Sequence, residues 1–252
     1  MHQGQCYVDN QVVTSAPGVP FSAIALTASR AVALRNALLV DAKDYLYSGA
    51  VSIGDAVQAI DRCLFSWATV KLYYSAFYLA RALLALHGTA FVYSGTKGYS
   101  WRSAPGAVAV KRNGATHKAV LSTFAAVLPS NPLLSQPIDS IGALDWLIKL
   151  REAANYNNAR FCEPNAPSHF EMHAANEIRA MVGAYSQDGE YLYTFDPEHA
   201  MLAFPIEALK QVLKQFSVGG HSGLLSAEDR KYLSSLYFDK AGPLSTMAEL
   251  FK

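Results

Sequence analysis

Residues 67–88 read WATVKLYYSAFYLARALLALHG, and the window 72–86 inside them is the most apolar of the chain. Nearly every position is apolar or aromatic, which predicts a helix over 66–87 that is buried on most of its sides. Gly88 follows at the C′ position, where a glycine commonly ends a helix. Because a membrane-spanning helix needs roughly 20 apolar residues, the shorter window indicates a core helix at the centre of the fold.

The segments on both sides of this helix are also mostly helical in pattern. A helix is expected over 22–47 and ended by Gly49, and the capping-box spacing of Ser52 and Asp55 predicts the next one, toward Arg62. Further helices are expected over 117–127, 139–156, 169–185, 206–216 and 226–237. Short strands are expected over 90–93, 107–110, 191–195 and 201–204, with a Gly/Ser/Pro-rich loop over 94–106. The chain is therefore predicted to be mainly α, a helical bundle with small β-hairpin additions.

Length and composition limit the organisation of the chain. It has 252 residues, of which 51% are hydrophobic and 16% charged, and this excludes a disordered protein. We expect an N-terminal extended arm over 1–20 and a helical bundle over 21–187 that carries a basic insert at about 89–118. A C-terminal α/β extension is expected over 188–252.

The cysteines and the N-terminus bear on location. Cys6, Cys63 and Cys162 are odd in number, far apart and form no CxxC pair, so neither a disulfide framework nor a cysteine zinc cluster is expected. Residues 1–20 lack the pattern of a secretory signal. Together with the absence of an apolar run of membrane-spanning length, these features predict a cytoplasmic protein with no membrane association.

The net charge of +1 hides an asymmetry. No Asp or Glu occurs between Asp61 and Asp139, whereas eight basic residues do. The candidate anion-binding residues of this stretch are Lys97, Tyr99, Trp101, Arg102, Lys111, Arg112, His117 and Lys118. Lys and Arg neutralise phosphates, and exposed aromatic rings stack on unpaired bases. The stretch predicts binding of RNA or a nucleotide; the alternative is a set of ordinary solvated charges beside a hairpin.

A metal or cofactor site is not predicted. His169 and His173 share a helical face with Glu171 between them, which could give two zinc ligands. No third ligand is evident from the spacing, so we interpret both histidines as surface residues. The chain has no phosphate-binding P-loop and no dinucleotide-binding glycine motif.

Two segments carry a resemblance to a known family. Residues 67–88 resemble a Tyr-rich helix of the HEPN (higher eukaryotes and prokaryotes nucleotide-binding) superfamily, of the form YYxxFxxARALL, and LREAANY at 150–156 is similar to a later helix with LRxxADY. The resemblance covers about 65–185. It implies an α-helical bundle that forms a homodimer. Many such proteins act as ribonuclease toxins or in antiviral defence, and others are binding or scaffold modules.

The resemblance also implies site residues. Catalytic members cleave RNA without metal, through an Arg that stabilises phosphate charge and a His, four to six residues further on, that acts as acid or base. Here Arg151 would be that Arg, with Asn155, Tyr156 or Asn157 positioning the substrate. The motif would place its His at residues 156–158, which here are Tyr156, Asn157 and Asn158. Because no His occurs there, the sequence leaves open whether the protein is an enzyme.

A second Arg–His pair occurs on the Tyr-rich helix. Arg81 and His87 have the motif spacing, but on a straight helix they lie about 120° apart around the axis and would not meet. The sequence therefore predicts a HEPN-like protein that binds RNA or a nucleotide. The alternative is a non-catalytic interaction subunit that docks a protein partner within a multi-protein complex.

Overall fold

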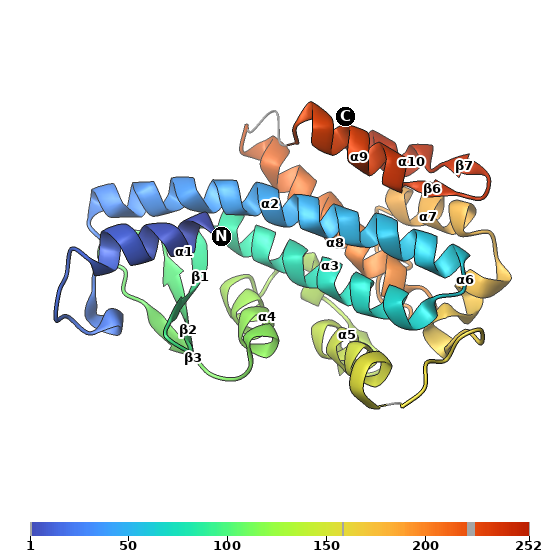
Figure 1. Cartoon of the computed structure of the whole chain (residues 1–252), viewed down its shortest axis with the longest axis horizontal. Coiled ribbons are helices and arrows are strands. Elements are labelled where there is room, and N and C mark those ends of the chain that lie inside the picture. The colour runs from blue at the N-terminus through green and yellow to red at the C-terminus, as the bar shows by residue number, and fades with distance from the viewer. Residues whose placement is uncertain (1, 158, 221–224, 252) are drawn as a thin grey trace. The chain divides into compact units, whose positions relative to one another are not determined.

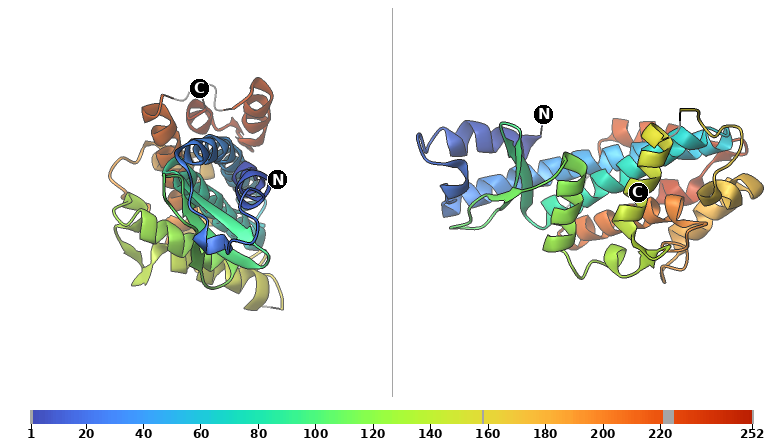
Figure 2. Two further views of the ribbon diagram at one scale, coloured as in Figure 1. Left: turned by 90° about the vertical axis from the view of Figure 1, so that its left-hand side faces the viewer. Right: turned by 90° about the horizontal axis from the view of Figure 1, so that it is seen from below.

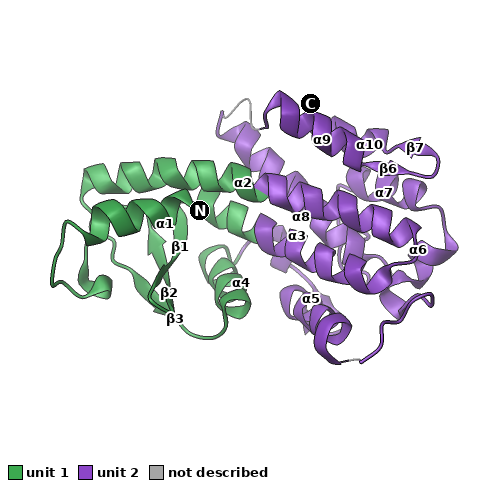
Figure 3. Cartoon of the chain, viewed as in Figure 1, with its two compact units in different colours: residues 1–45, 80–129 green, residues 46–79, 130–252 purple. Residues whose placement is uncertain are grey.

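The computed structural model describes residues 2–157, 159–220 and 225–251, which are mainly helical (Figure 1). The chain forms two compact units, coloured in Figure 3. Unit 1 comprises residues 1–45 and 80–129, and unit 2 comprises residues 46–79 and 130–252. The long helices α2 (Ala28–Asp61) and α3 (Phe65–Leu86) contribute to both units. The domain boundaries expected near residues 20 and 187 do not coincide with the boundaries of these two units.

The N-terminal segment of unit 1 is helical. It contains α1 (Gln3–Tyr7), the π-helical segment η1 (Val8–Val13) and the 3-10 turn η2 (Phe21–Ala23). The expectation of an extended arm is therefore wrong over residues 3–13. Asp41 of α2 explains the difference, because its carboxylate accepts the backbone N–H groups of Gln3 and Gly4 at 2.6 and 2.8 Å. This long-range cap holds α1 beside α2 (Figures 1 and 2).

A three-stranded antiparallel sheet follows α3 in unit 1. Its strands are β1 (Thr89–Ser94), β2 (Lys97–Arg102) and β3 (Val110–Arg112), in the order β1-β2-β3, and α4 (Thr116–Val127) follows. The predicted loop over 94–106 is thus wrong over β2. The glycines and serines of this segment are typical of a loop, but Tyr99 and Trp101, two residues apart, lie on the same buried face and stabilise a strand.

Helix α2 is continuous where two helices were expected. Gly49 does not end it, and residues 52–61 continue the same helix. A Cβ added at Gly49 would lie 2.8 Å from Leu79 of α3, and one at Gly54 would lie 3.0 Å from Leu236. The two glycines therefore allow close packing within unit 2, and the Ser75 hydroxyl donates to the Gly49 carbonyl at 3.0 Å in the same contact.

Helix α3 confirms the prediction for the most apolar stretch. Most of its side chains are buried, and Gly88 follows with φ +70, the left-handed conformation of a C′ residue. At its start in unit 2, the Glu163 carboxylate accepts the Ser66 backbone N–H at 2.7 Å and the Ser66 hydroxyl at 2.8 Å. Burial acts to raise the pKa of Glu163, but these hydrogen bonds outweigh it and lower the pKa.

The rest of unit 2 is a succession of helices with two short strand pairs. The elements are η3 (Pro132–Leu134), β4 (Pro137–Ile138), β5 (Ile141–Gly142), α5 (Ala143–Glu152), the π-helical segment η4 (Ala153–Asn157), η5 (Ser168–Phe170), α6 (Glu171–Ala175), α7 (Ile178–Gln187), α8 (Ala200–Val218), α9 (Ala227–Leu236), β6 (Phe238–Asp239), β7 (Gly242–Pro243) and α10 (Ser245–Glu249). The capping box of Ser226 and Asp229 starts α9, in the region where a helix is expected over 226–237.

The strands predicted over 191–195 and 201–204 are wrong. The first segment forms turns, and the second lies in α8, which also contains Pro205. Residues 200–209 are all buried, and Glu207 is their one charged residue, so this part of α8 lacks the apolar periodicity of a half-exposed helix that would have identified it. No helix in the described part of the chain is both long and apolar enough to cross a bilayer.

Candidate anion-binding site

One face of the sheet in unit 1 gathers polar and basic side chains. Thr89 pairs with Arg102 across β1 and β2, and Ser100 pairs with Val110 across β2 and β3. Because side chains on a strand alternate between faces, residues two apart share a face. Arg112, two residues after Val110, therefore lies on the same face as Arg102.

These side chains line a cavity of about 430 Å³ within unit 1, which we name the basic cavity. Its polar wall consists of His87, Thr89, Ser100, Arg102 and Arg112, and its apolar wall of Val108, Val110, Ala126, Val127 and Leu128. No Asp or Glu is among the described residues that line it. A cavity with two guanidinium groups and no carboxylate is suited to holding an anion, and the apolar wall can pack against the rest of a ligand.

Hydrogen bonds fix part of the polar wall. Arg112 Nε donates to Ser100 Oγ at 2.8 Å, which orients the guanidinium while leaving its terminal nitrogens for other partners. His87 Nδ1 lies 2.9 Å from the Leu83 carbonyl oxygen. Since a carbonyl only accepts, Nδ1 carries a proton and Nε2 is the ring nitrogen left for a ligand.

The structure separates the aromatic residues of the predicted site from its arginines. Tyr99 and Trp101 lie on the opposite face of β2 and are 8% and 0% exposed. Their rings pack on Phe21, with centroids 4.7 and 5.3 Å apart, and Trp101 Nε1 donates to the Ala107 carbonyl at 3.0 Å. The expectation of exposed rings on a loop is wrong, so these rings are not available to stack on bases.

The remaining predicted residues of the basic stretch do not line the cavity. Lys97, Lys111 and Lys118 are exposed, and His117 is half-buried in the first turn of α4. Sequence reasoning placed His87 only in a pair with Arg81. Arg81 instead lies over the Tyr45 ring, 4.4 Å from its centroid, so the two residues do not meet, as their helical spacing predicts. The signal missed for His87 was its position two residues before β1, which begins at Thr89.

Arg151 lies in unit 2, where the two segments that carry the family resemblance meet. It is 8% exposed, and its guanidinium lies 4.9 Å from the centre of the Tyr73 ring and 5.6 Å from that of Tyr156. Its Nε has no hydrogen-bond partner among the described residues, and its Nη2 lies 4.0 Å from Oε1 of Glu152. Burial raises the pKa of Tyr73 to about 12, although the Arg151 charge opposes this shift.

The residues after Arg151 form the π-helical segment η4. Asn155 is half-buried, and Tyr156 and Asn157 are exposed; Asn158 lies outside the described residues. Tyr156 and Asn157, which stand at places of the motif His, do not supply an imidazole for acid–base chemistry near neutral pH.

His169 and His173 are buried, so their interpretation as surface residues is wrong. His169 Nε2 lies 2.9 Å from Thr69 Oγ1, and His173 Nε2 lies 3.2 Å from the Tyr185 hydroxyl. Each ring completes a hydrogen bond inside unit 2, which the spacing of the two histidines did not indicate. Across residues 2–157, 159–220 and 225–251, no three His, Cys, Asp or Glu side chains are grouped so that they could hold a metal ion.

No protein-family model, no curated protein and no solved structure significantly matches this chain. The resemblance to HEPN proteins therefore stays a prediction, and the geometry of the basic cavity carries the functional argument.

Proposed function

We propose that the protein binds the phosphate groups of RNA or of a nucleotide in the basic cavity of unit 1. The observation that carries this proposal is the convergence of Arg102, Arg112 and His87 on one cavity without a carboxylate. Guanidinium groups form paired, charge-assisted hydrogen bonds with phosphate oxygens, typically stronger than neutral ones. The apolar wall beside α4 would pack on a ribose or base.

The test compares two double variants that remove the same charge. R102M/R112M alters the cavity, whereas K97M/K118M alters exposed lysines outside it. Affinities for labelled single-stranded RNA and for a mononucleotide are measured at low and moderate salt. R102M/R112M is expected to weaken binding by about 10- to 1,000-fold and to flatten the salt dependence. Equal losses in both variants, or no binding by the native protein at any salt, would overturn the proposal.

The two ligands distinguish the sources of phosphate. Binding of the mononucleotide alone would assign the cavity to a nucleotide, and tighter binding of RNA would assign it to RNA. Incubation of the same RNA without metal tests for cleavage. If the RNA is cleaved, H87A and R151A show whether the basic cavity or the Arg151 segment acts. Arg151 and Tyr73, from the two segments that resemble HEPN proteins, are in contact. Cleavage of the RNA would support a HEPN-like ribonuclease, toxin or defence role.

A different observation favours the second candidate function, a non-catalytic interaction subunit. In unit 2, Trp67 and Phe161 are 47% and 50% exposed, and their rings contact each other with centroids 5.8 Å apart. Leu64, which is 43% exposed, is a further apolar residue near the start of α3. Exposed Trp and Phe are typical of protein interfaces. This surface would serve a homodimer or a protein partner within a complex.

Sedimentation of the native protein and of W67S tests the interaction surface. A native dimer that W67S converts to a monomer would support self-association; L192S, at another exposed leucine, is the matched control. We further propose that the protein acts in the cytoplasm, which its three free thiols support.

A further inference from the structure

A second cavity, in unit 2, contains groups that the proposed phosphate site does not use. Its volume is about 260 Å³, and it lies between the end of α2, the junction of α6 with α7, and the turn from β6 to β7. We name it the acidic cavity. Its chemically active lining consists of Asp61, Cys63, His173, Glu177, Asp239 and Lys240.

One ring nitrogen of His173, a residue that lines this cavity, has no hydrogen-bond partner among the described residues. The residue is 3% exposed, and this nitrogen is Nδ1. Its Nε2 is 3.2 Å from the Tyr185 hydroxyl, which is also 2.7 Å from His199 Nδ1. A hydroxyl has a single proton, and the shorter contact assigns it to His199. His173 Nε2 then donates to the Tyr185 oxygen, and His173 Nδ1 is left as an acceptor.

The ring of His173 is neutral at physiological pH. Burial, together with the nearby His199 and His169, lowers the pKa of His173 to about 3. His173 therefore adds no positive charge to the cavity, and its Nδ1 keeps a lone pair.

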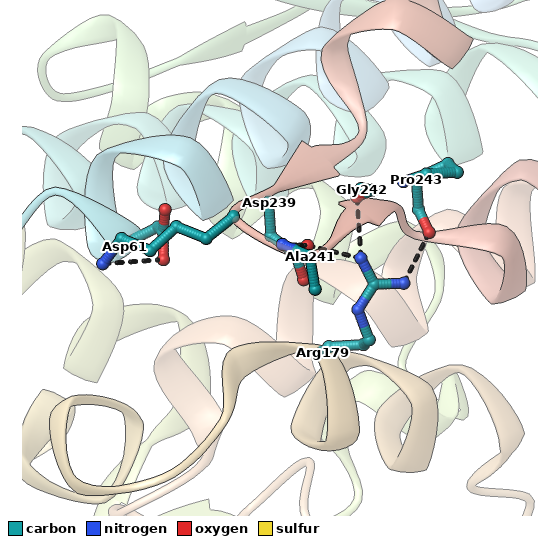
Figure 4. A network of polar contacts seen from close by, with 7 residues as sticks. Asp61, Arg179, Asp239, Ala241, Gly242 and Pro243 are labelled. Atoms are coloured by element: carbon teal, nitrogen blue, oxygen red, sulfur yellow. Dashed lines mark hydrogen bonds and ion pairs between the residues drawn. The ribbon is translucent and has the colours of Figure 1, made fainter.

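Asp239 is already engaged and forms part of the fixed wall. Its carboxylate contacts the Arg179 guanidinium and accepts the Ala241 backbone N–H at 2.8 Å (Figure 4). Arg179 also donates to the carbonyl oxygens of Gly242 and Pro243, at 2.7 and 2.6 Å. These contacts hold the β6–β7 turn in place, so the wall exists before any ligand binds.

The other two carboxylates are available to a ligand. Asp61 pairs with Lys240 at 3.4 Å, but the Lys240 side chain is 79% exposed, and such pairs contribute little to stability. Glu177 has no ion pair within the part of the chain that the structure describes. Two carboxylates, which accept hydrogen bonds, and the His173 residue therefore line a cavity whose other walls include Ile60, Phe65 and Ile178.

We propose that the acidic cavity binds a small organic cation, whose ammonium or guanidinium N–H groups donate to the carboxylates of Glu177 and Asp61, beside the uncharged His173. The carbon chain of the ligand packs on the apolar wall. A cavity of about 260 Å³ limits the ligand to a small amine or guanidine. The proposal does not depend on the basic cavity, which belongs to unit 1.

Calorimetric titration of the full chain tests the proposal, with butylammonium and agmatine as probes and butyrate as the matched anion. Both cations are expected to bind saturably with a Kd of about 1 mM or tighter, and butyrate is not. E177Q is expected to weaken cation binding about tenfold or more. E171Q is the matched control, because Glu171 is exposed on α6 and does not line the cavity.

A second measurement uses Cys63, an exposed thiol of the cavity wall. Bound cation is expected to slow its alkylation by iodoacetamide, as mapped by mass spectrometry, while Cys6 of unit 1 serves as the internal reference. No saturable binding of either cation up to about 10 mM would overturn the proposal. Equal affinity of E177Q and the native protein would also overturn it.

Discussion

Gly49 of α2 and Leu79 of α3 are in such close contact that a Cβ on Gly49 would lie 2.8 Å from Leu79 Cγ. G49A is therefore expected to destabilise the protein by about 1–3 kcal/mol, because Leu79 or the helix backbone must shift. The measurement is urea unfolding of the native protein and the variant.

Gly183 supplies the control for this substitution. It lies inside α7, and a Cβ added there would meet no other atom within 4 Å. G183A is expected to leave the stability unchanged or to raise it by about 0.5–1 kcal/mol, because alanine favours a helix. An equal effect of the two substitutions would contradict the close contact.

The N-terminal helix depends on a side chain distant in sequence. D41A removes the acceptor of the Gln3 and Gly4 backbone N–H groups and is expected to cost about 1–2 kcal/mol. Limited proteolysis should then cut within residues 3–13 faster than in the native protein. D55A, which breaks only the partly exposed pair with Lys71, is expected to cost less than about 1 kcal/mol and to leave this segment protected.

How far the sequence predicts the fold depends on whether the signal is local. The apolar run of α3, Gly88 after it and the helix that begins after Ser226 are predicted from the sequence because neighbouring residues determine them. Gly49 was misread as a helix end, because only the distant Leu79 shows that it serves packing. The helical form of residues 3–13 likewise depends on Asp41, which no local pattern reveals.

The sequence likewise predicts some features of the candidate sites and misses others. The acid-free stretch indicated anion binding, and Arg102 and Arg112 do share a cavity. If 94–106 is a loop, its side chains are not expected to alternate between two faces as they do in a strand. Tyr99 and Trp101 are then expected to be exposed. In the acidic cavity, Asp61 is distant in the sequence from His173 and Glu177, so their meeting is a property of the tertiary fold.

The buried histidines make stability depend on pH. Burial lowers the pKa of His169 to about 4, below the value of 6.5 that an unfolded chain has. Between these values the unfolded state binds more protons, so stability is lost as the pH falls from about 6.5 toward 4. At pH 5 this loss amounts to about 2 kcal/mol for His169.

H169Q isolates this contribution, since Gln can still hydrogen-bond Thr69 but does not titrate. Urea unfolding at pH 7 and pH 5 is expected to show a smaller loss of stability for H169Q than for the native protein, by about 2 kcal/mol. The same pH dependence in both proteins would show that His169 is protonated without cost in the folded state.

Ser100 positions Arg112 in the basic cavity, and a variant separates this role from stability. S100A removes the oxygen that accepts from Arg112 Nε at 2.8 Å, so the guanidinium gains rotational freedom. On the proposed function, S100A should weaken phosphate binding about 3- to 10-fold, in keeping with a hydrogen bond of roughly 1 kcal/mol. S122A, at an exposed serine of α4 outside the cavity, should bind as the native protein does. If S100A binds normally but R112M does not, Arg112 acts through its charge alone and needs no fixed orientation.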